Sequence, residues 1–521
     1  MVSKELAQAR EHEAAAGAAV QEEDRPVCHF TARTGWLNDP NGLSFYNGTY
    51  HLFYQYHPYS TYWGPMHWGH AVSRDLIKWK YLPAAMSPDT EYDKSGCFSG
   101  SALTLEDGRH MLMYTSCGDS SEDPTGKGRW LQTQSLAILG DDGEYVKYEG
   151  NPVISEKDLP EDADPYEFRD PFIWKGKDGT YRVLVAAARA AEAAGEEPEG
   201  GTYILMYRSS DGIHWGDGKV FFEDDRRIGV MWECPNFFPL GDRHVLIASP
   251  MDMKAEEGEA VGSIRFPQGN NVCYITGRYS EDSDTFVPDT DRAGRYRYEP
   301  VDSGLDFYAP QVLHTIDGRR VMIGWMQDPS VGNTESNGRR QSGIFGQMTV
   351  PRELSLRDNR LIQWPVSELE EYRTDESVWP PITMAPVWLR VPGIEGRAMD
   401  LEIDIRTKRS CKGCGMRFAA DEEHYTQLWY DPAKSVITID RSHSGQDESI
   451  PSKRTVKVSE RKGRLSLRVI LDKWSAEIFI NGGEQVISVT YYTDLSAEGI
   501  RFRAEGEAEM DITAYKLAAD R

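Results

Sequence analysis

Residues 36–54 read WLNDPNGLSFYNGTYHLFY. The pair Asn47-Gly48 favours a tight turn, because asparagine and glycine tolerate the positive φ that such turns require. The run Tyr50–Tyr54 that follows the turn is rich in aromatic residues and is typical of a β-strand. Together these features predict a β-hairpin whose first strand carries Asp39, nine residues before Gly48.

The same turn-and-strand unit recurs four more times in the first two thirds of the chain. Asp107-Gly108, Asp178-Gly179 and Asp317-Gly318 each precede a hydrophobic run, and a further copy around Gly241 lies one residue out of register. Five irregularly spaced copies predict a five-bladed β-propeller, with a β-sandwich of accidental spacing as the alternative. In a propeller the first strand of each blade faces the central channel, so equivalent positions of the repeat converge there. Counted back from the five glycines, these positions are Asp39, Ser99, Asp170, Glu233 and Ala309.

The two ends of the chain have different patterns. The N-terminal residues are rich in Ala, Glu, Lys and Arg and predict a short helix. The last third shows alternating strands separated by turns, such as 401–405 and 476–480, which are typical of an antiparallel β-sandwich. We therefore expect an all-β protein with a helical arm at 1–26, a propeller at 27–365, a linker at 366–375 and a sandwich at 376–521.

Composition and charge argue against several classes of function. The formal net charge of the 521-residue chain is −25 and there is no Lys/Arg-rich run, which disfavours binding to nucleic acid or to an anionic membrane. Neither a transmembrane stretch nor the apolar segment of a signal peptide is present, so we expect a cytoplasmic protein. Seven cysteines, an odd number, indicate free thiols, and the pair Cys411 and Cys414 lacks the second ligand pair of a zinc site.

Three of the five convergent positions are acidic, which suits the cleavage of a glycosidic bond. That reaction needs a proton donor for the departing oxygen and, in retaining enzymes, a carboxylate that attacks the anomeric carbon. Asp39 suits the nucleophile, whereas the longer Glu233 suits the proton donor because apolar neighbours and the charge of Asp39 favour its protonated form. Asp170 would hold the sugar hydroxyls. Asp39 or Asp170 alone is more typical of a turn and Glu233 in an isolated Glu-Cys-Pro is uninformative, but the joint placement of the three acids reverses that interpretation.

Six short motifs stand at or near these positions: Trp36–Gly42 (WLNDPNG), Phe98–Ser101 (FSGS), Phe168–Pro171 (FRDP), Glu233–Pro235 (ECP), Asp306–Ala309 (DFYA) and Gly324–Met326 (GWM). In content and order they resemble glycoside hydrolase family 32, the family of invertases, inulinases and related fructosyl-transferring enzymes. The resemblance spans about residues 28 to 515, and the segment 63–70 is most similar to bacterial intracellular members. The family has Met where Leu37 stands and often Asn where His57 stands, which leaves fine specificity open.

The resemblance implies a retaining mechanism through a covalent fructosyl-enzyme, with Asp39 as nucleophile, Asp170 as transition-state stabiliser and Glu233 as acid/base. The carboxylates supply this chemistry, so no cofactor is expected. Three acids could also hold Ca²⁺, but no His cluster or calcium-loop motif accompanies them, and we expect no metal. By motif position, the substrate-binding residues are Asn38, Gln55, Trp63, Phe98, Ser99, Arg169, Tyr308 and Trp325. Core packing is the alternative role for both tryptophans.

The sequence therefore predicts a hydrolase of terminal, non-reducing β-D-fructofuranosyl residues in sucrose and short fructo-oligosaccharides. A fructosyltransferase, in which a sugar intercepts the intermediate, and a sucrose-6-phosphate hydrolase are alternatives within the same chemistry. A non-catalytic fructan-binding protein is an alternative from another class. The expected partners are small sugars, and the sandwich face or the N-terminal helix could also pair with a second copy of the chain.

Overall fold

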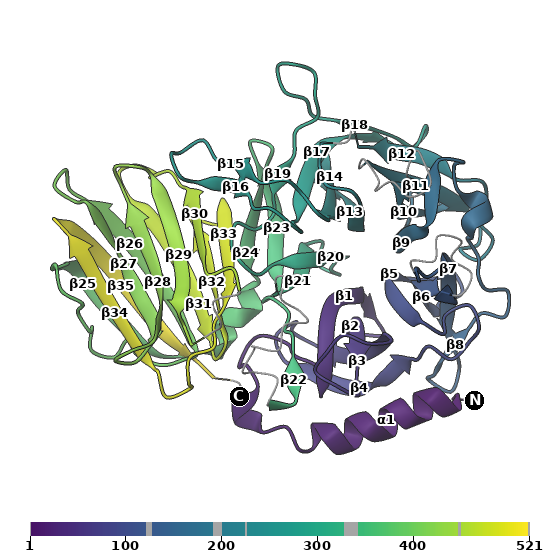
Figure 1. Ribbon diagram of the computed structural model, residues 1–521, viewed down its shortest axis with the longest axis horizontal. Coiled ribbons are helices and arrows are strands. Elements are labelled where there is room, and N and C mark those ends of the chain that lie inside the picture. Colours follow the sequence, from purple (N-terminus) through teal and green to yellow (C-terminus); the bar gives the residue numbers. More distant parts are fainter. Residues whose placement is uncertain are drawn as a thin grey trace.

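The computed structural model of the chain describes residues 2–120, 128–190, 201–224, 227–327, 342–445 and 450–518. A ring of sheets around an axis lies beside two layered sheets, and helix α1 (Lys4–Gly17) runs along the outside of the ring (Figure 1). The predicted all-β class, with a short N-terminal helix, a propeller and an antiparallel sandwich, is confirmed. None of the helices formed by these residues is long and apolar enough to cross a membrane.

Among the described residues, five sheets surround the axis, and each contains a run of four antiparallel strands (Figure 1). We assign each sheet to one blade of the predicted repeat. Blade 1 comprises β1 (Gly35–Tyr46), β2 (Thr49–His57), β3 (His67–Ser73) and β4 (Trp79–Met86), and blade 2 comprises β5 (Gly96–Thr104), β6 (His110–Cys117), β7 (Gln132–Leu139) and β8 (Tyr145–Lys147). Blade 3 comprises β9 (Ala163–Lys175), β10 (Tyr181–Arg189), β11 (Thr202–Ser209) and β12 (Lys219–Glu223).

The last two blades contain insertions. Blade 4 comprises β13 (Trp232–Leu240), β14 (Arg243–Pro250), β17 (Cys273–Ser280) and β18 (Thr285–Pro288), with the small strands β15 (Glu256–Glu257), β16 (Ile264–Phe266) and β19 (Glu299–Pro300) around them. Blade 5 comprises β20 (Tyr308–His314), β21 (Arg320–Trp325), β23 (Arg352–Arg357) and β24 (Arg360–Pro365). The short β22 (Ile344–Phe345) pairs in parallel with β1. This pairing links the connection between β21 and β23 of blade 5 to the first strand of blade 1.

The first strands of the blades form a closed ring. β1 contacts both β5 and β20, β9 contacts both β5 and β13, and β13 contacts β20. Because every first strand touches its two neighbours, side chains that project inward from these strands meet around one axis. The convergence predicted from the repeat therefore follows from the ring closure.

Each first strand is interrupted at the predicted repeat position. The pairing register of each hairpin shifts there, as in a β-bulge, and in four of the five strands a proline contributes to the interruption because it has no N–H for the ladder. Asp170, Cys234 and Ala309 adopt positive φ angles of 67°, 48° and 46° at these points. The residue–proline pairs are Asp39-Pro40, Asp170-Pro171, Cys234-Pro235 and Ala309-Pro310. Cys234 thus occupies the equivalent position in blade 4, and Glu233, which the sequence count placed there, lies one residue earlier.

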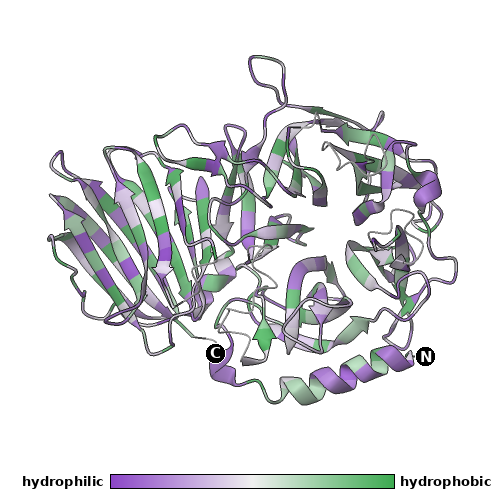
Figure 2. Cartoon of the chain, in the orientation of Figure 1, coloured by the Kyte–Doolittle hydropathy of each residue, from purple (hydrophilic) through white to green (hydrophobic). Residues whose placement is uncertain are grey.

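Two sheets packed face to face form the C-terminal sandwich (Figure 1). A short 3-10 helix, Ser367–Tyr372, leads into it. In its strands away from the propeller hydrophilic and hydrophobic residues alternate (Figure 2), because one face packs into the core and the other meets solvent. One sheet has the order β25 (Arg373–Thr383), β35 (Ala508–Leu517), β26 (Met399–Thr407), β31 (Leu465–Asp472), β32 (Ser475–Ile480) and β33 (Gln485–Thr490). The other has the order β30 (Lys453–Lys457), β29 (Val436–His443), β28 (Tyr425–Asp431), β27 (Gly413–Ala420) and β34 (Gly499–Glu505).

A fully buried ionic network joins the propeller to the sandwich. His29 Nδ1 lies 2.8 Å from Oδ2 of Asp472, and its Nε2 lies 3.0 Å from Oε1 of Glu477. Arg352 of blade 5 donates from Nε to the other oxygen of Glu477 at 2.8 Å. Burial lowers the pKa of His29, but the two carboxylates outweigh burial and raise the pKa to about 9. At neutral pH the histidine is therefore protonated and ion-paired.

Replacing His29 with glutamine should lower the free energy of unfolding by about 3 kcal/mol near pH 6, because two buried carboxylates lose a cation. The folded pKa of His29 exceeds its unfolded value of 6.5, so its stabilisation is complete below pH 6.5 and is lost as the pH rises through 9. Urea unfolding at pH 6 and pH 9.5 measures the difference between wild type and variant at each pH. The exposed pair of His214 with Asp211 provides the control His214→Gln, which should cost less than about 0.5 kcal/mol. If His29→Gln lost the same free energy of unfolding at pH 6 and at pH 9.5, His29 would not be a protonated, ion-paired residue at neutral pH.

Candidate active site

A cavity of about 230 Å³ is lined by residues of the first strands of all five blades, of the second strands β2 and β21, and of nearby loops. Every site residue predicted from the sequence lines this one cavity, so the structure brings the whole set together, while their individual roles stay predictions. Three further residues that the sequence analysis did not single out also line it. The predicted residues are Asn38, Asp39, Gln55, Trp63, Phe98, Ser99, Arg169, Asp170, Glu233, Tyr308 and Trp325, and the additional ones are Trp36, Met251 and Asn270.

The residues at four of the five strand interruptions, Asp39, Ser99, Asp170 and Cys234, form one layer of contacts. Ser99 donates from Oγ to Oδ2 of Asp39 at 2.6 Å, and Asn38 donates from Nδ2 to Oδ1 of Asp39 at 2.9 Å. The backbone N–H of Cys234 donates to Oδ2 of Asp170 at 2.9 Å. The Cys234 thiol lies 3.7 Å from Oδ2 of Asp39 and 3.7 Å from Oδ2 of Asp170, and so stands between the two carboxylates. These contacts fix both aspartates.

Residues one position earlier in three of the first strands form a second layer, in which Arg169 and Tyr308 bind Glu233. Arg169 donates from Nε to Oε1 of Glu233 at 3.0 Å, and Tyr308 donates from its hydroxyl to Oε2 of Glu233 at 2.6 Å. Arg169 also pairs with Glu167. The sequence analysis expected apolar neighbours for Glu233, and the structure instead places an arginine and a tyrosine hydroxyl on its two oxygens. This difference arises because the neighbours come from adjacent blades, so their identity depends on the order of the ring.

The aspartates bind protons more readily than free aspartate. Burial raises the pKa of Asp39 to about 6, the charge of Glu233 adds to this effect, and the hydrogen bond from Ser99 opposes it. Burial also raises the pKa of Asp170, and the nearby Glu233 and Asp39 reinforce the shift against the opposing charge of Arg169. Three carboxylates that share one cavity cannot all ionise without mutual repulsion. The site can therefore hold a proton while another carboxylate stays charged.

Asp39, the nucleophile predicted from the sequence, must be ionised to attack, so the acid limb of the pH–activity profile should lie near pH 6. We expect kcat/KM for the hydrolysed substrate to fall about tenfold per pH unit below that value. Replacing Ser99 with alanine removes a hydrogen bond that favours the charged form, so the limb should move to higher pH by about one unit. Ser101→Ala is the matched control, since that hydroxyl bonds to the carbonyl of Pro171 and not to Asp39. A limb unchanged in Ser99→Ala would exclude Asp39 as the titrating group.

Aromatic rings form two walls of the cavity. Trp63 stacks on Trp130 at a centroid distance of 5.8 Å, and it meets Phe98 edge-on at 6.1 Å. Trp36 and Trp325 meet edge-on at 5.9 Å. The indole N–H of Trp325 is buried and has no hydrogen-bond partner among the described residues, so it is available to a hydroxyl in the cavity.

The remaining predicted binding residues have fixed orientations. Gln55 is buried and donates from Nε2 to the carbonyl of Cys97 at 2.9 Å. Asn38 accepts from Nε1 of Trp36 at 2.7 Å, which orients its amide toward Asp39. The same X-Pro signal that marks Asp39 could have identified Cys234. Met251 and Asn270 have no local signal, because they reach the cavity through pairing and loops that the sequence does not reveal.

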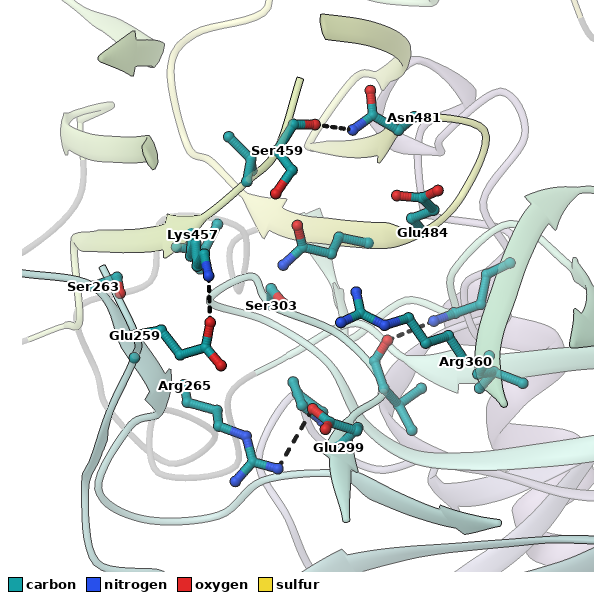
Figure 3. Close-up of a pocket in the computed structure, with 18 of the residues that line it drawn as sticks. Glu259, Ser263, Arg265, Glu299, Ser303, Arg360, Lys457, Ser459, Asn481 and Glu484 are labelled. Atoms are coloured by element: carbon teal, nitrogen blue, oxygen red, sulfur yellow. Dashed lines mark hydrogen bonds and ion pairs between the residues drawn. The ribbon is translucent and has the colours of Figure 1, made fainter. Parts of the chain in front are cut away.

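A larger cleft, of about 420 Å³, lies between blades 4 and 5 and the sandwich. Figure 3 shows charged side chains of both signs around it, with Lys457 directed at Glu259 and Arg265 at Glu299. None of the predicted site residues lines this cleft. The described residues also contain one group of potential metal ligands, Cys28, His29 and Asp472, which belongs to the buried network between the domains. Neither feature has the carboxylate arrangement of the axial cavity.

The fold and the axial cavity together define a class of protein. A carboxylate bound by a serine and an asparagine, a second one bound by an arginine and a tyrosine, and aromatic walls suited to sugar rings fit the requirements for cleaving a glycosidic bond. The protein is a glycoside hydrolase. The description "Glycosyl hydrolases family 32 N-terminal domain" matches residues 29–365, and "Glycosyl hydrolases family 32 C terminal" matches residues 368–517. The chain belongs to glycoside hydrolase family 32.

Known proteins are similar over nearly the whole chain. The sucrose-6-phosphate hydrolase of Zymomonas mobilis is 35% identical over 511 residues, which cover 93% of this chain and 90% of that protein. The levanase of Bacillus subtilis is 32% identical over 517 residues, which cover 94% of this chain and 70% of that protein. The structure of the Bombyx mori family 32 β-fructofuranosidase BmSUC1 matches with a TM-score of 0.80 at 30% identity over 98% of both chains. A variant of BmSUC1 in complex with sucrose matches with a TM-score of 0.79.

Proposed function

We propose that this protein releases terminal, non-reducing β-D-fructofuranosyl residues from sucrose and short fructo-oligosaccharides, with retention of configuration. The observation that supports this function most strongly is the pairing of Asp39, held by Ser99 and Asn38, with Glu233, held by Arg169 and Tyr308, in one cavity. The names of the relatives add support, because they include a β-fructofuranosidase and a levanase.

In the first step, Asp39 attacks the anomeric carbon of the fructosyl unit while Glu233 donates its proton to the glycosidic oxygen. A bond forms between the carboxylate oxygen of Asp39 and that carbon, the glycosidic bond breaks, and the leaving sugar departs with the proton. The hydrogen bonds from Ser99 and Asn38 hold Asp39 in place for this attack. The Arg169 guanidinium keeps Glu233 within reach of the leaving oxygen.

In the second step, water attacks the same carbon. Glu233, now a carboxylate, takes one proton from the water, and the bond to Asp39 breaks to give fructose. Asp170 lies beside Asp39 and is positioned by the backbone N–H of Cys234, so it can bind sugar hydroxyls as positive charge develops in the ring. The indole N–H of Trp325, which has no partner within the described part of the chain, provides a further donor. The scheme needs no cofactor.

A second candidate is the hydrolysis of sucrose 6-phosphate. It is favoured by the relatives from Zymomonas mobilis and Escherichia coli, which are named sucrose-6-phosphate hydrolases. The chemistry at the anomeric carbon would be the same, and the difference would lie in recognition of the phosphate. A transferase activity would differ only in the acceptor of the second step.

The experiment that separates these candidates compares the products from sucrose, 1-kestose, inulin and sucrose 6-phosphate over time. Fructose from sucrose and kestose supports the first proposal, and a kcat/KM for sucrose 6-phosphate far above that for sucrose supports the second. Longer oligosaccharides at high sucrose would support the transferase. A protein that binds fructan and yields no product from any substrate at any pH from about 4 to 8 would refute all three.

We further propose the domain boundaries 1–26, 27–365, 366–375 and 376–521. The end of β24 at Pro365 and the family matches support the division, although β25 begins at Arg373, inside the proposed linker. We also propose a cytoplasmic location, which seven free cysteines support. Pairing of two copies through the sandwich or α1 stays a prediction that size-exclusion chromatography tests.

A further inference from the structure

We propose that helix α1 positions the substrate, because the ring of His12 holds the loop that carries Trp63 into the cavity. The inference rests on the proposed function, in which Trp63 contacts the sugar. It assigns a task in the reaction to the N-terminal arm, which otherwise has the features of a surface helix.

The loop concerned joins β2 to β3 and contains residues 58–66. Its Trp63 lines the cavity, stacks on Trp130 and meets Phe98 edge-on. Phe98 immediately precedes Ser99, the residue that holds Asp39. A displacement of Trp63 would therefore alter the cavity wall beside the proposed nucleophile.

The base of this loop is held by a small cluster of rings. His57 Nδ1 lies 3.3 Å and His67 Nδ1 lies 3.0 Å from the carbonyl oxygen of Pro65. Tyr59 meets both imidazoles edge-on, with centroid distances of 5.7 Å to His57 and 5.8 Å to His67. The cluster thus links the start of the loop, its end and the strand beyond it.

The contact between this cluster and Trp63 is tight. Gly64, the residue after Trp63, lies against the ring of His57, and a Cβ atom at Gly64 would come within 2.5 Å of His57 Cε1. The backbone beside Trp63 therefore cannot move independently of His57. Tyr59 packs on His57, and His57 packs on Gly64, the neighbour of Trp63. A displacement of Tyr59 would therefore shift Trp63 through these contacts.

Tyr59 is 45% exposed, and α1 supplies a ring that packs on it. The imidazole of His12 lies at a centroid distance of 5.0 Å from the Tyr59 ring, with the planes inclined by 48°. The centroid distance lies within the range of favourable aromatic pairs. Tyr59 is consequently restrained from the arm as well as from the cluster.

The arm itself is anchored to the propeller independently of the loop. Arg10 pairs with Glu144 of blade 2 at 2.7 Å, and Glu13 accepts a hydrogen bond from the backbone N–H of Ala84 in blade 1 at 2.9 Å. Figure 1 shows α1 running beside β4, across the outside of these two blades. His12 lies between the two anchored residues along the helix. The position of His12 is therefore set by blades 1 and 2. Its ring contact with Tyr59 in turn restrains the loop 58–66.

The test is steady-state kinetics with sucrose on the wild type, His12→Ala, Tyr59→Ala and the double variant. We expect KM to rise roughly 2- to 12-fold in His12→Ala, the range that one aromatic pair can transmit, with kcat little changed. Tyr59→Ala should raise KM at least as much. The double variant should be no worse than Tyr59→Ala, because His12 acts through that ring. Glu11→Ala, on the exposed side of the same helix, is the control, and His12→Phe should restore KM.

A purely structural arm would give another pattern. A lower melting temperature in His12→Ala with an unchanged KM would overturn the proposal, as would strictly additive effects of the two alanine substitutions. The wild-type reaction separates this failure from that of the proposed function. A wild type that releases no fructose from sucrose or kestose would refute the proposed hydrolase function and, with it, the positioning role of α1. An active wild type whose KM is unchanged in the variants would refute only the positioning role.

Discussion

In an Asp39→Asn variant, kcat for sucrose falls by a factor on the order of 10⁴ to 10⁶, the loss typical of removing a covalent nucleophile. Asparagine has nearly the same shape and can still accept the hydrogen bond from Ser99, but a neutral amide cannot attack the anomeric carbon. The reaction then has no route to the fructosyl-enzyme. Initial-rate measurements on the purified variant, with substrate binding measured by calorimetry, separate lost chemistry from lost affinity.

The control for this prediction is Asp164→Asn. Asp164 is a buried aspartate of the same propeller, it pairs with Arg129, and it does not line the cavity. Its replacement should cost stability and leave kcat close to the wild-type value. Turnover of sucrose at the wild-type rate by Asp39→Asn would exclude Asp39 as nucleophile.

Replacing Glu233 with glutamine should lower kcat for sucrose by about 10²- to 10⁴-fold, which is the usual contribution of a positioned general acid. The amide can still accept from the Tyr308 hydroxyl, but its NH₂ group cannot accept from Arg169, so one donor loses its partner. A substrate whose leaving group departs without a proton should lose far less. The ratio of the two losses, measured on sucrose and on an activated fructoside, is the diagnostic quantity.

Glu167→Gln offers a matched comparison, because Glu167 binds the same Arg169 and does not line the cavity. The decrease of kcat in Glu167→Gln should be small, and it should be equal for sucrose and for the activated fructoside. In Glu233→Ala the second step also lacks its base, so an activated fructoside should leave a fructosyl adduct on Asp39 that mass spectrometry detects. Equal losses on both substrates in Glu233→Gln would argue against the acid role.

Much of the propeller could be predicted because its signals are local. Asn47-Gly48 and the four later copies report hairpins through backbone conformations that only a few residue types adopt. The prolines after Asp39 and Asp170 mark the interruption of the strand for an equally local reason, the missing N–H. The count missed Cys234 because it lies seven residues before its turn glycine, Gly241, whereas the equivalent residues of the other four copies lie nine residues before theirs.

The surroundings of Glu233 could not be predicted in the same way. Its partners Arg169 and Tyr308 come from the blades before and after it, some 64 and 75 positions away in the chain. Whether such residues meet depends on ring closure, which is a property of five sheets packed together. The protonated His29 between Asp472 and Glu477 has the same origin, since it requires the docking of the sandwich on the propeller.

The sequence was sufficient for the repeated hairpins, for the sandwich pattern and for the positions of the three acidic residues, because each depends on residue preferences within a few bonds of the backbone. Tertiary structure alone established the two layers of contacts in the cavity, the stacking of Trp63 on Trp130 and the reach of His12 to Tyr59. Those contacts join segments that are distant in the chain. They form only when long-range packing has brought the blades, the loop and the arm together, and no local preference records that packing.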